Sequence, residues 1–128
     1  MADTEKITIN LSVVDLGQVD LLVEQGFYSN RSDFIRTAIR NQLSTHAEVV
    51  KQTVVRKQIA IGVLNYSRKD LEAKRAAGEK LDINVVGMAN IAGDVTPELA
   101  LDTIQSLQVY GVLRASPAVR DALADRIR

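Results

Sequence analysis

Residues 6–12, with the sequence KITINLS, alternate between polar and apolar side chains. Successive side chains of a strand point to opposite faces, so Ile7, Ile9 and Leu11 share one face. The apolar face requires a core, and the polar face presents an ammonium group, a hydroxyl group and a carboxamide. The pattern therefore predicts one short, half-buried strand near the N-terminus.

Two helices are expected after this strand, because the spacing of apolar positions changes from two to three and four residues. Ser12 is suited to cap the first helix, and Gly26 is suited to end it. The second helix lies in the segment GFYSNRSDFIRTAIRNQL, residues 26–43, with Ser29 as the expected N-cap. The predicted order is thus strand, helix, short turn, helix.

A single strand with two helices cannot form a stable fold alone, because the strand's backbone groups have no partner. About forty residues is also close to the lower limit for independent folding. A two-fold dimer meets both needs: strand 6–12 pairs antiparallel with its copy, and four helices bury the apolar face. The polar face of this ribbon stays outside, and a two-stranded ribbon fits the major groove of B-DNA.

The strand KITINLS, a helix ending at Gly26, and the segment YSNRSDFIRTAIRNQL resemble the ribbon-helix-helix family of DNA-binding proteins, in its CopG-like branch. The resemblance covers residues 5–44, and its most specific part is the turn and helix from Ser29 to Arg36. It implies an intertwined homodimer with a two-stranded antiparallel ribbon and four helices, bound to double-stranded DNA.

The resemblance assigns base reading to three outward strand residues, Lys6, Thr8 and Asn10. The chemistry agrees, because lysine suits guanine acceptors, asparagine binds adenine bidentately, and threonine offers a hydroxyl and a methyl group. The alternative is that these side chains are only the solvated face of a strand, which the layout as a whole disfavours.

The resemblance also implies that the start of the second helix holds a DNA phosphate through its backbone. The residues at this position are Ser29, Asn30, Arg31 and Ser32. Free N–H groups and the helix dipole favour an anion there. Arg31 alternatively decorates the turn, and Arg36 and Arg40 are interpreted as a solvated helix face outside the site.

Residues 45–57 connect this region to the rest of the chain. Thr45 and Glu48 have the spacing of a capping box, which predicts a linking helix to about Arg56. Four valines in the same segment are equally typical of a strand, so both structures stay open.

From residue 59 the chain repeats with a period of 24 residues. Each row begins with an alternating, β-branched segment and ends with a helix-like segment. Gly87 and Gly111 coincide, whereas the first row has Val63 at that position. The matching columns are Ile59, Ile83 and Leu107; Ile61, Val85 and Val109; Leu71, Val95 and Val119; and, with one departure, Arg75, Leu99 and Leu123.

Alternating strands and helices without hairpin signals predict parallel strands joined by crossover helices. The row length is in the range of a short parallel solenoid, and neither end shows a polar cap, which favours stacking on further copies. We therefore expect an α+β chain. Its parts are a ribbon-helix-helix domain at 1–44, a linker at 45–57, and a β-α repeat domain at 58–128 for oligomerisation or sensing.

Composition narrows the chemistry. The chain has no cysteine and a single histidine, His46, which argues against a metal site, and no cofactor is expected. Residues 1–46 carry four Lys and Arg against six Asp and Glu, so DNA binding must rest on the local placement of cations. There is no apolar run that could span a membrane and no secretory signal, so we expect a cytoplasmic protein without a membrane partner.

These features favour a dimeric, sequence-specific DNA-binding regulator of transcription, acting as a repressor, with higher homo-oligomers formed through residues 58–128. The alternatives are an architectural protein that coats DNA, an antitoxin of a toxin–antitoxin pair, and a repressor with a C-terminal small-ligand sensor. An enzyme is disfavoured, because no Gly-rich phosphate loop and no nucleophile elbow occurs. Asp94, Glu98 and Asp102 are interpreted as surface charge.

Overall fold

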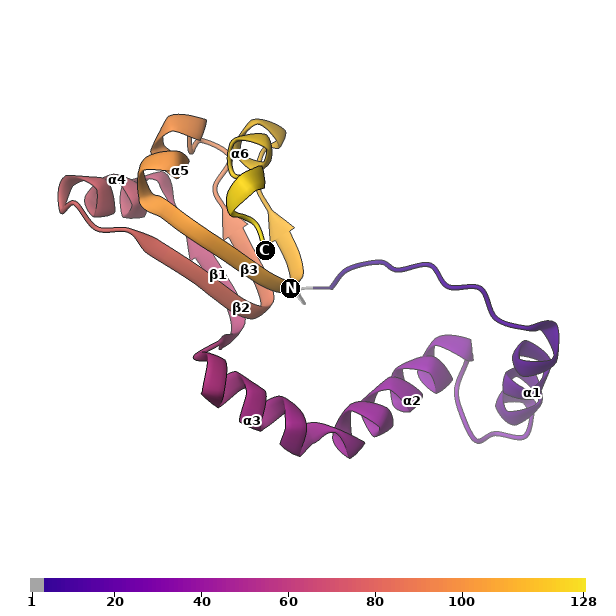
Figure 1. Cartoon of the computed structure of the whole chain (residues 1–128). Coiled ribbons are helices and arrows are strands. Elements are labelled where there is room, and N and C mark those ends of the chain that lie inside the picture. The colour runs from indigo at the N-terminus through magenta and orange to yellow at the C-terminus, as the bar shows by residue number, and fades with distance from the viewer. Residues whose placement is uncertain (1–3) are drawn as a thin grey trace. The chain divides into compact units, whose positions relative to one another are not determined.

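The computed structural model describes residues 4–128, so residues 1–3 of the predicted first domain lie outside the description. The chain forms two compact units, the first ending at Thr53 and the second covering Val54–Arg128. The elements, labelled in Figure 1, are α1 (Val13–Glu24), α2 (Arg31–Thr45), α3 (Ala47–Lys57), β1 (Ala60–Tyr66), α4 (Arg68–Ala76), β2 (Leu81–Ile91), α5 (Pro97–Thr103), β3 (Ile104–Arg114), α6 (Pro117–Ala122) and the 3-10 helix η1 (Ala124–Arg126).

The caps of α1 are those that the sequence predicts. The Ser12 hydroxyl accepts a hydrogen bond from the backbone N–H of Asp15 at 3.1 Å. At the other end, Gly26 adopts a φ of +87°, and its N–H donates to the carbonyl of Val23. Glycine tolerates this left-handed conformation without a Cβ penalty, which explains why the helix ends there.

Residues 4–12 contain no strand, and they run to α1 outside any sheet (Figure 1). The chain mixes helices and strands as predicted, yet the sheet found among residues 4–128 is parallel and lies in the C-terminal unit. The antiparallel ribbon is thus not part of the fold of one chain. A lone segment cannot form a ladder, because each ladder hydrogen bond needs a second strand.

Residues 47–57 form the helix α3, which decides between the two structures open for this segment. The predicted cap at Thr45 is wrong: its hydroxyl donates to the carbonyl of Asn41 at 3.1 Å and closes the last turn of α2. Glu48 in the first turn of α3, with Arg56 and Lys57 in the last turn, complements the helix dipole.

The C-terminal unit contains a three-stranded sheet in the order β1-β2-β3, with all neighbours parallel, which confirms the predicted strand direction. Helices α4, α5 and α6 lie on one face of this sheet (Figure 1). The core lies between the helices and this face. Its buried residues are Leu71, Ile83, Val85, Ala89, Ile91, Val95, Leu99, Ala100, Ile104, Leu107, Val119 and Leu123.

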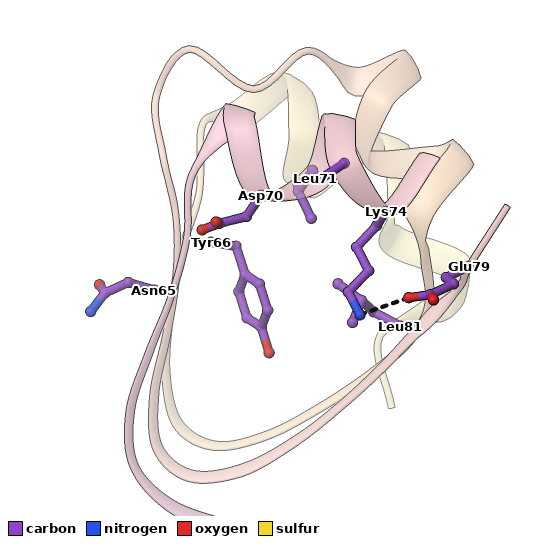
Figure 2. Close-up of a pocket in the computed structure, with 8 residues that line it drawn as sticks. Asn65, Tyr66, Asp70, Leu71, Lys74, Glu79 and Leu81 are labelled. Atoms are coloured by element: carbon purple, nitrogen blue, oxygen red, sulfur yellow. Dashed lines mark hydrogen bonds and ion pairs between the residues drawn. The ribbon is translucent and has the colours of Figure 1, made fainter. Parts of the chain in front are cut away.

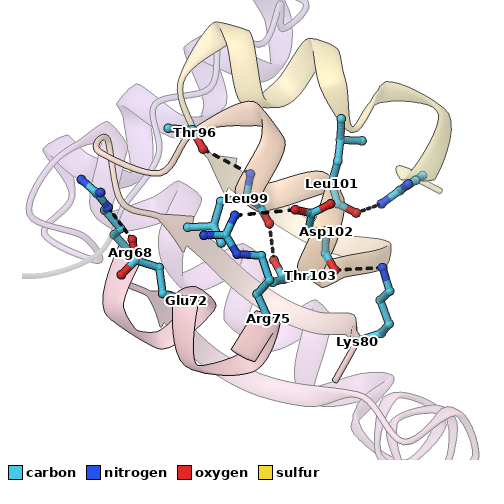
Figure 3. A network of polar contacts seen from close by, with 10 residues as sticks. Arg68, Glu72, Arg75, Lys80, Thr96, Leu99, Leu101, Asp102 and Thr103 are labelled. Atoms are coloured by element: carbon cyan, nitrogen blue, oxygen red, sulfur yellow. Dashed lines mark hydrogen bonds and ion pairs between the residues drawn. The ribbon is translucent and has the colours of Figure 1, made fainter. Parts of the chain in front are cut away.

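Polar side chains fasten the short helix α5 to its neighbours (Figure 3). Lys80 donates to the carbonyl of Asp102 at 2.8 Å, and Arg126 donates to the carbonyls of Leu101 and Ile104 at 2.6 and 2.7 Å. These cations satisfy carbonyl groups near the end of α5 that have no partner in the helix.

Three glycines form a row across the sheet. Gly62 pairs with Gly87 and Gly87 with Gly111, and their φ angles are +132°, +134° and +131°. A Cβ atom on Gly87 would overlap the carbonyl oxygen of Gly62, and one on Gly111 would overlap that of Gly87. The backbones therefore approach too closely for a side chain at Gly87 and Gly111, whereas an added Cβ on Gly62 has no atom within 4 Å.

The glycine row also sets the register. Between β2 and β3, Ile83 pairs with Leu107 and Val85 with Val109, which is the predicted 24-residue offset. Between β1 and β2 the offset is one residue longer, because Gly62 rather than Val63 aligns with Gly87.

The connecting helices do not share the 24-residue period. Their N-cap residues are Ser67, Thr96 and Ser116, which are unevenly spaced along the chain. The regular spacing therefore belongs to the strands rather than to whole strand-and-helix units.

Candidate nucleic-acid interface

The segment before α1 has two different sides. Lys6, Thr8 and Asn10 are exposed. Ile9 and Leu11 lie at a groove of about 400 Å³ that α1 and α2 form. The remaining residues of this groove are mainly apolar, and they are Asp15, Gln18, Val19, Leu22, Phe34, Ile35 and Ala38.

The apolar side of this segment is incompletely covered within one chain. Ile7 is 72% exposed, and Ile9 and Leu11 are 56% and 43% exposed although they line the groove. Isoleucine and leucine are usually buried, and a row of three on one side of an extended segment needs a further surface.

A bidentate ion pair fastens the start of α2 to α1. Arg31 donates from Nε and from its second guanidinium nitrogen to the two carboxylate oxygens of Asp20, each at 2.8 Å. This hydrogen bonding holds the pKa of the Asp20 carboxyl below its usual range and raises the pKa of Arg31. The Arg31 side chain is therefore engaged in joining two helices.

The residue that caps α2 is Asn30, so the expectation of Ser29 is wrong. The Asn30 carboxamide oxygen accepts from the backbone N–H of Asp33 at 2.8 Å. The Asp33 carboxylate in turn accepts from the backbone N–H of Ser29 at 2.9 Å. Asparagine and serine are equally good caps, and the position of Asp33 three residues after Asn30 decides between them.

The four predicted phosphate-binding residues thus lie together at the start of α2, but not all of their donors are free. The backbone N–H of Ser29 donates to the Asp33 carboxylate, and the Asn30 carboxamide oxygen accepts from the backbone N–H of Asp33. The backbone N–H groups of Arg31 and Ser32 have no acceptor among residues 4–128, as expected for the first turn of a helix. These two groups are available to donate to an anion.

Asp20 and Asp33 also belong to this site, and the sequence did not identify either of them. Asp33 carries a usable signal, because an acidic residue at the third helical position typically returns a hydrogen bond to the turn before the helix. Asp20 carries none, because its partner is eleven residues away and belongs to another helix.

The ion pair makes a prediction about pH. The carboxyl resonance of Asp20 should titrate below the usual range of aspartate, and Arg31→Gln should return the midpoint to that range, because the lost guanidinium hydrogen bonds stabilise the carboxylate. The folded-state pKa is lowered, so any stabilisation by the pair is present at neutral pH and is lost as the pH falls through that pKa.

An NMR titration of the side-chain carboxyl groups measures this midpoint. The Asp20 midpoint in the Arg31→Gln chain serves as the reference. If Asp20 has the same midpoint in the unaltered chain and in the Arg31→Gln chain, the ion pair does not persist in solution.

A second pocket, of about 500 Å³, lies between β1 and α4 in the C-terminal unit (Figure 2). Its charged side chains have partners: Asp70 accepts from the backbone N–H of Ser67 at 3.1 Å, and Lys74 donates to Glu79 at 2.9 Å. Burial raises the pKa of the Tyr66 phenol at its centre. Because the charged groups are paired internally, this pocket is a weaker candidate for a ligand site.

Neither a helix long and apolar enough to cross a membrane nor a group of metal-ligating side chains occurs among the described residues. Searches of curated proteins and of solved structures give no match. A sequence model of the Ribbon-Helix-Helix transcriptional regulator family matches residues 2–120, which include the segment before α1, the helices α1 and α2, and most of the C-terminal unit. The chain belongs to the ribbon-helix-helix transcriptional regulator family.

Proposed function

We propose that this chain is a homodimeric repressor that reads DNA sequence with an antiparallel ribbon made of two copies of residues 6–12. The observation that carries the proposal is the two-sided character of this segment. Its apolar residues lie toward the groove of α1 and α2 and remain partly exposed, whereas Lys6, Thr8 and Asn10 face outward. Pairing with a second copy covers the apolar side and doubles the polar row.

The start of α2 supplies the phosphate contact in this proposal. The N–H groups of Arg31 and Ser32 bind one phosphate oxygen, and the ion pair with Asp20 keeps this turn in place against α1. Such contacts position the protein on the duplex, while the ribbon carries the sequence information.

The C-terminal unit joins bound dimers into larger assemblies in this proposal. The edge of β1 and one sheet face are available to another copy, whereas the C-terminal residues of the same chain pair with the edge of β3 at Leu107. Cooperative contacts between neighbouring dimers strengthen binding to adjacent half-sites.

Selection from a pool of randomised duplexes tests the function. The full chain should enrich a site with two half-sites related by two-fold symmetry, because the reading ribbon is symmetric. Enrichment without sequence or symmetry would contradict sequence-specific reading.

On the selected duplex, Asn10→Ala should weaken binding by about 1–3 kcal/mol, because it removes a bidentate contact to one base. The preference over a scrambled duplex should fall by a similar amount. Asn41→Ala, at an exposed asparagine on α2, is the matched control and should leave both values unchanged. A loss that is equal on the selected and the scrambled duplex would remove Asn10 from base reading.

A coating protein is the second candidate, favoured by the open β1 edge and the exposed face of the C-terminal sheet. Footprinting across a titration separates the two functions. A repressor protects the short symmetric site first, whereas a coating protein protects any sequence in one steep step as copies add to one another.

A further inference from the structure

The sheet of the C-terminal unit has a second face, and the only helical contact described on it among residues 4–128 is at one end, where the Asn84 carboxamide of β2 donates to the carbonyl of Lys57 in α3 at 3.2 Å. Helices α4, α5 and α6 all lie on the other side, against the core (Figure 1). Alternation along the strands places a row of large apolar side chains on this outer face. The members of the row are Ile61 and Val63 of β1, Val86 and Met88 of β2, and Tyr110 and Val112 of β3.

The register brings these six side chains together as one patch, which we call the outer face. Ile61, Val86 and Tyr110 are in line across the sheet, and so are Val63, Met88 and Val112. Ile61 is 68% exposed, Val63 39% and Tyr110 41%, and the other three are half-buried. Parallel sheets are normally covered on both faces, so the patch has the character of an interface.

Charge at the two ends of the outer face favours a second copy as the occupant. Asp82 lies where β2 begins, and Arg114 lies where β3 ends, each on the outer side of its strand. Two copies that pack with their strands in opposite directions place the acidic end of each beside the basic end of the other. A two-fold axis produces this arrangement, and it makes the surface self-complementary.

The size of the outer face points to a partner that is already held nearby. Three strands about 4.8 Å apart, with about seven paired residues of 3.3 Å each, cover roughly 300 Å² per copy. Stable complexes of free proteins bury about 1,200–2,000 Å² in total. This face alone is too small for such a complex, but it is sufficient between copies that another contact has brought together.

We infer that the outer face packs against the same face of a second copy of this chain, sheet on sheet, with the strands of the two copies in opposite directions. The inference rests on the proposed DNA-binding dimer, which supplies the high local concentration. It assigns the higher assembly to the patch around Met88 rather than to the sheet edges.

Thiol cross-linking in the full chain tests this arrangement, because the natural sequence contains no cysteine. Packed sheets lie about 10 Å apart, which is too far for a disulfide, so the probe is a short bis-maleimide. Met88→Cys places one thiol at the centre of the outer face. Glu98→Cys, an exposed position on α5 on the helix side, is the matched control.

The Met88→Cys chain should form covalent dimers at least tenfold faster than the Glu98→Cys chain. Adding Ile61→Lys, or separately Tyr110→Glu, should remove that difference, because each places charges against the apolar patch of the other copy. Val55→Lys, at an exposed valine of α3, should leave the difference in cross-linking rate unchanged. Circular dichroism shows whether each variant is folded. If only one of Ile61→Lys and Tyr110→Glu folds, that variant alone is sufficient for the test.

Equal rates for the two cysteine variants would overturn the inference, and so would fast cross-linking that neither outer-face variant slows. Sedimentation velocity on the same samples separates this result from a failure of the proposed function. If the chain is dimeric but Met88→Cys does not cross-link, only the outer-face contact is contradicted. Single chains at micromolar concentration contradict the dimer and the contact together.

Discussion

Gly87→Ala should destabilise the C-terminal unit by about 4 kcal/mol or more, a large part of the stability of an ordinary domain. Two costs add at this position. A φ of +134° is a conformation essentially reserved for glycine, which costs about 1–3 kcal/mol for alanine. The new methyl group would also overlap the carbonyl oxygen of Gly62, which is backbone and cannot move without breaking the strand pairing.

Two other glycines provide the controls for this prediction. Gly62 has nearly the same φ, but nothing lies within 4 Å of its added Cβ, so Gly62→Ala should show the conformational cost alone. Gly93 has neither a left-handed φ nor a close neighbour, so Gly93→Ala should be near neutral.

Urea unfolding measures the three free energies, with hydrogen exchange of the strand amides reporting on this unit separately. The expected order of loss is Gly87→Ala, then Gly62→Ala, then Gly93→Ala. Equal losses for the first two would show that backbone conformation matters and that close approach of the strands does not.

Ile9→Asp should abolish the dimer and lower affinity for the selected duplex at least a hundredfold. Ile9 lies at the groove between α1 and α2 and is 56% exposed in one chain, so its remaining surface is available to the second copy. A carboxylate buried there has no partner, which costs several kcal/mol. A single chain then presents only half of the ribbon.

Sedimentation equilibrium and duplex binding test this prediction on the full chain. Val55→Asp, at a 70% exposed valine of the C-terminal unit, carries the same charge change outside residues 6–12 and should leave both measurements unaltered. The helical signal in circular dichroism should persist in both variants, because neither position is an N-cap of α1 or α2. A dimer that survives Ile9→Asp would place the contact between copies elsewhere.

Local chemistry made much of the N-terminal region predictable. Ser12 and Gly26 mark the ends of α1 because a side-chain cap and a left-handed glycine act within a few residues. The N-cap of α2 was predicted at Ser29 and is Asn30. These residues are adjacent and both suit a cap, and only the hydrogen bonds of Asp33 show which of them has this role. The Asp20–Arg31 pair joins two helices, and no local pattern encodes it.

The C-terminal unit was predictable in direction and less so in register. Alternating β-branched segments without hairpin turns are sufficient to indicate parallel strands, and β1, β2 and β3 have this arrangement. The predicted period of 24 residues places Val63 opposite Gly87, whereas the structure pairs Gly62 with Gly87. The connections differ in length, and the strands align by their glycines. The six apolar residues of the outer face come from three strands, and only the strand register shows that they form one patch.

The row of three glycines also indicates where residues can be inserted into the chain without loss of the fold. Since strand alignment depends on the close backbone approach at Gly62, Gly87 and Gly111, the connections between strands are free to vary in length, as the uneven spacing of Ser67, Thr96 and Ser116 illustrates. Residues inserted between Gly93 and Asp94, which are both exposed, are therefore tolerable. A single residue inserted between Asp82 and Gly87 moves a side chain into the row and turns the core residues of β2 outward.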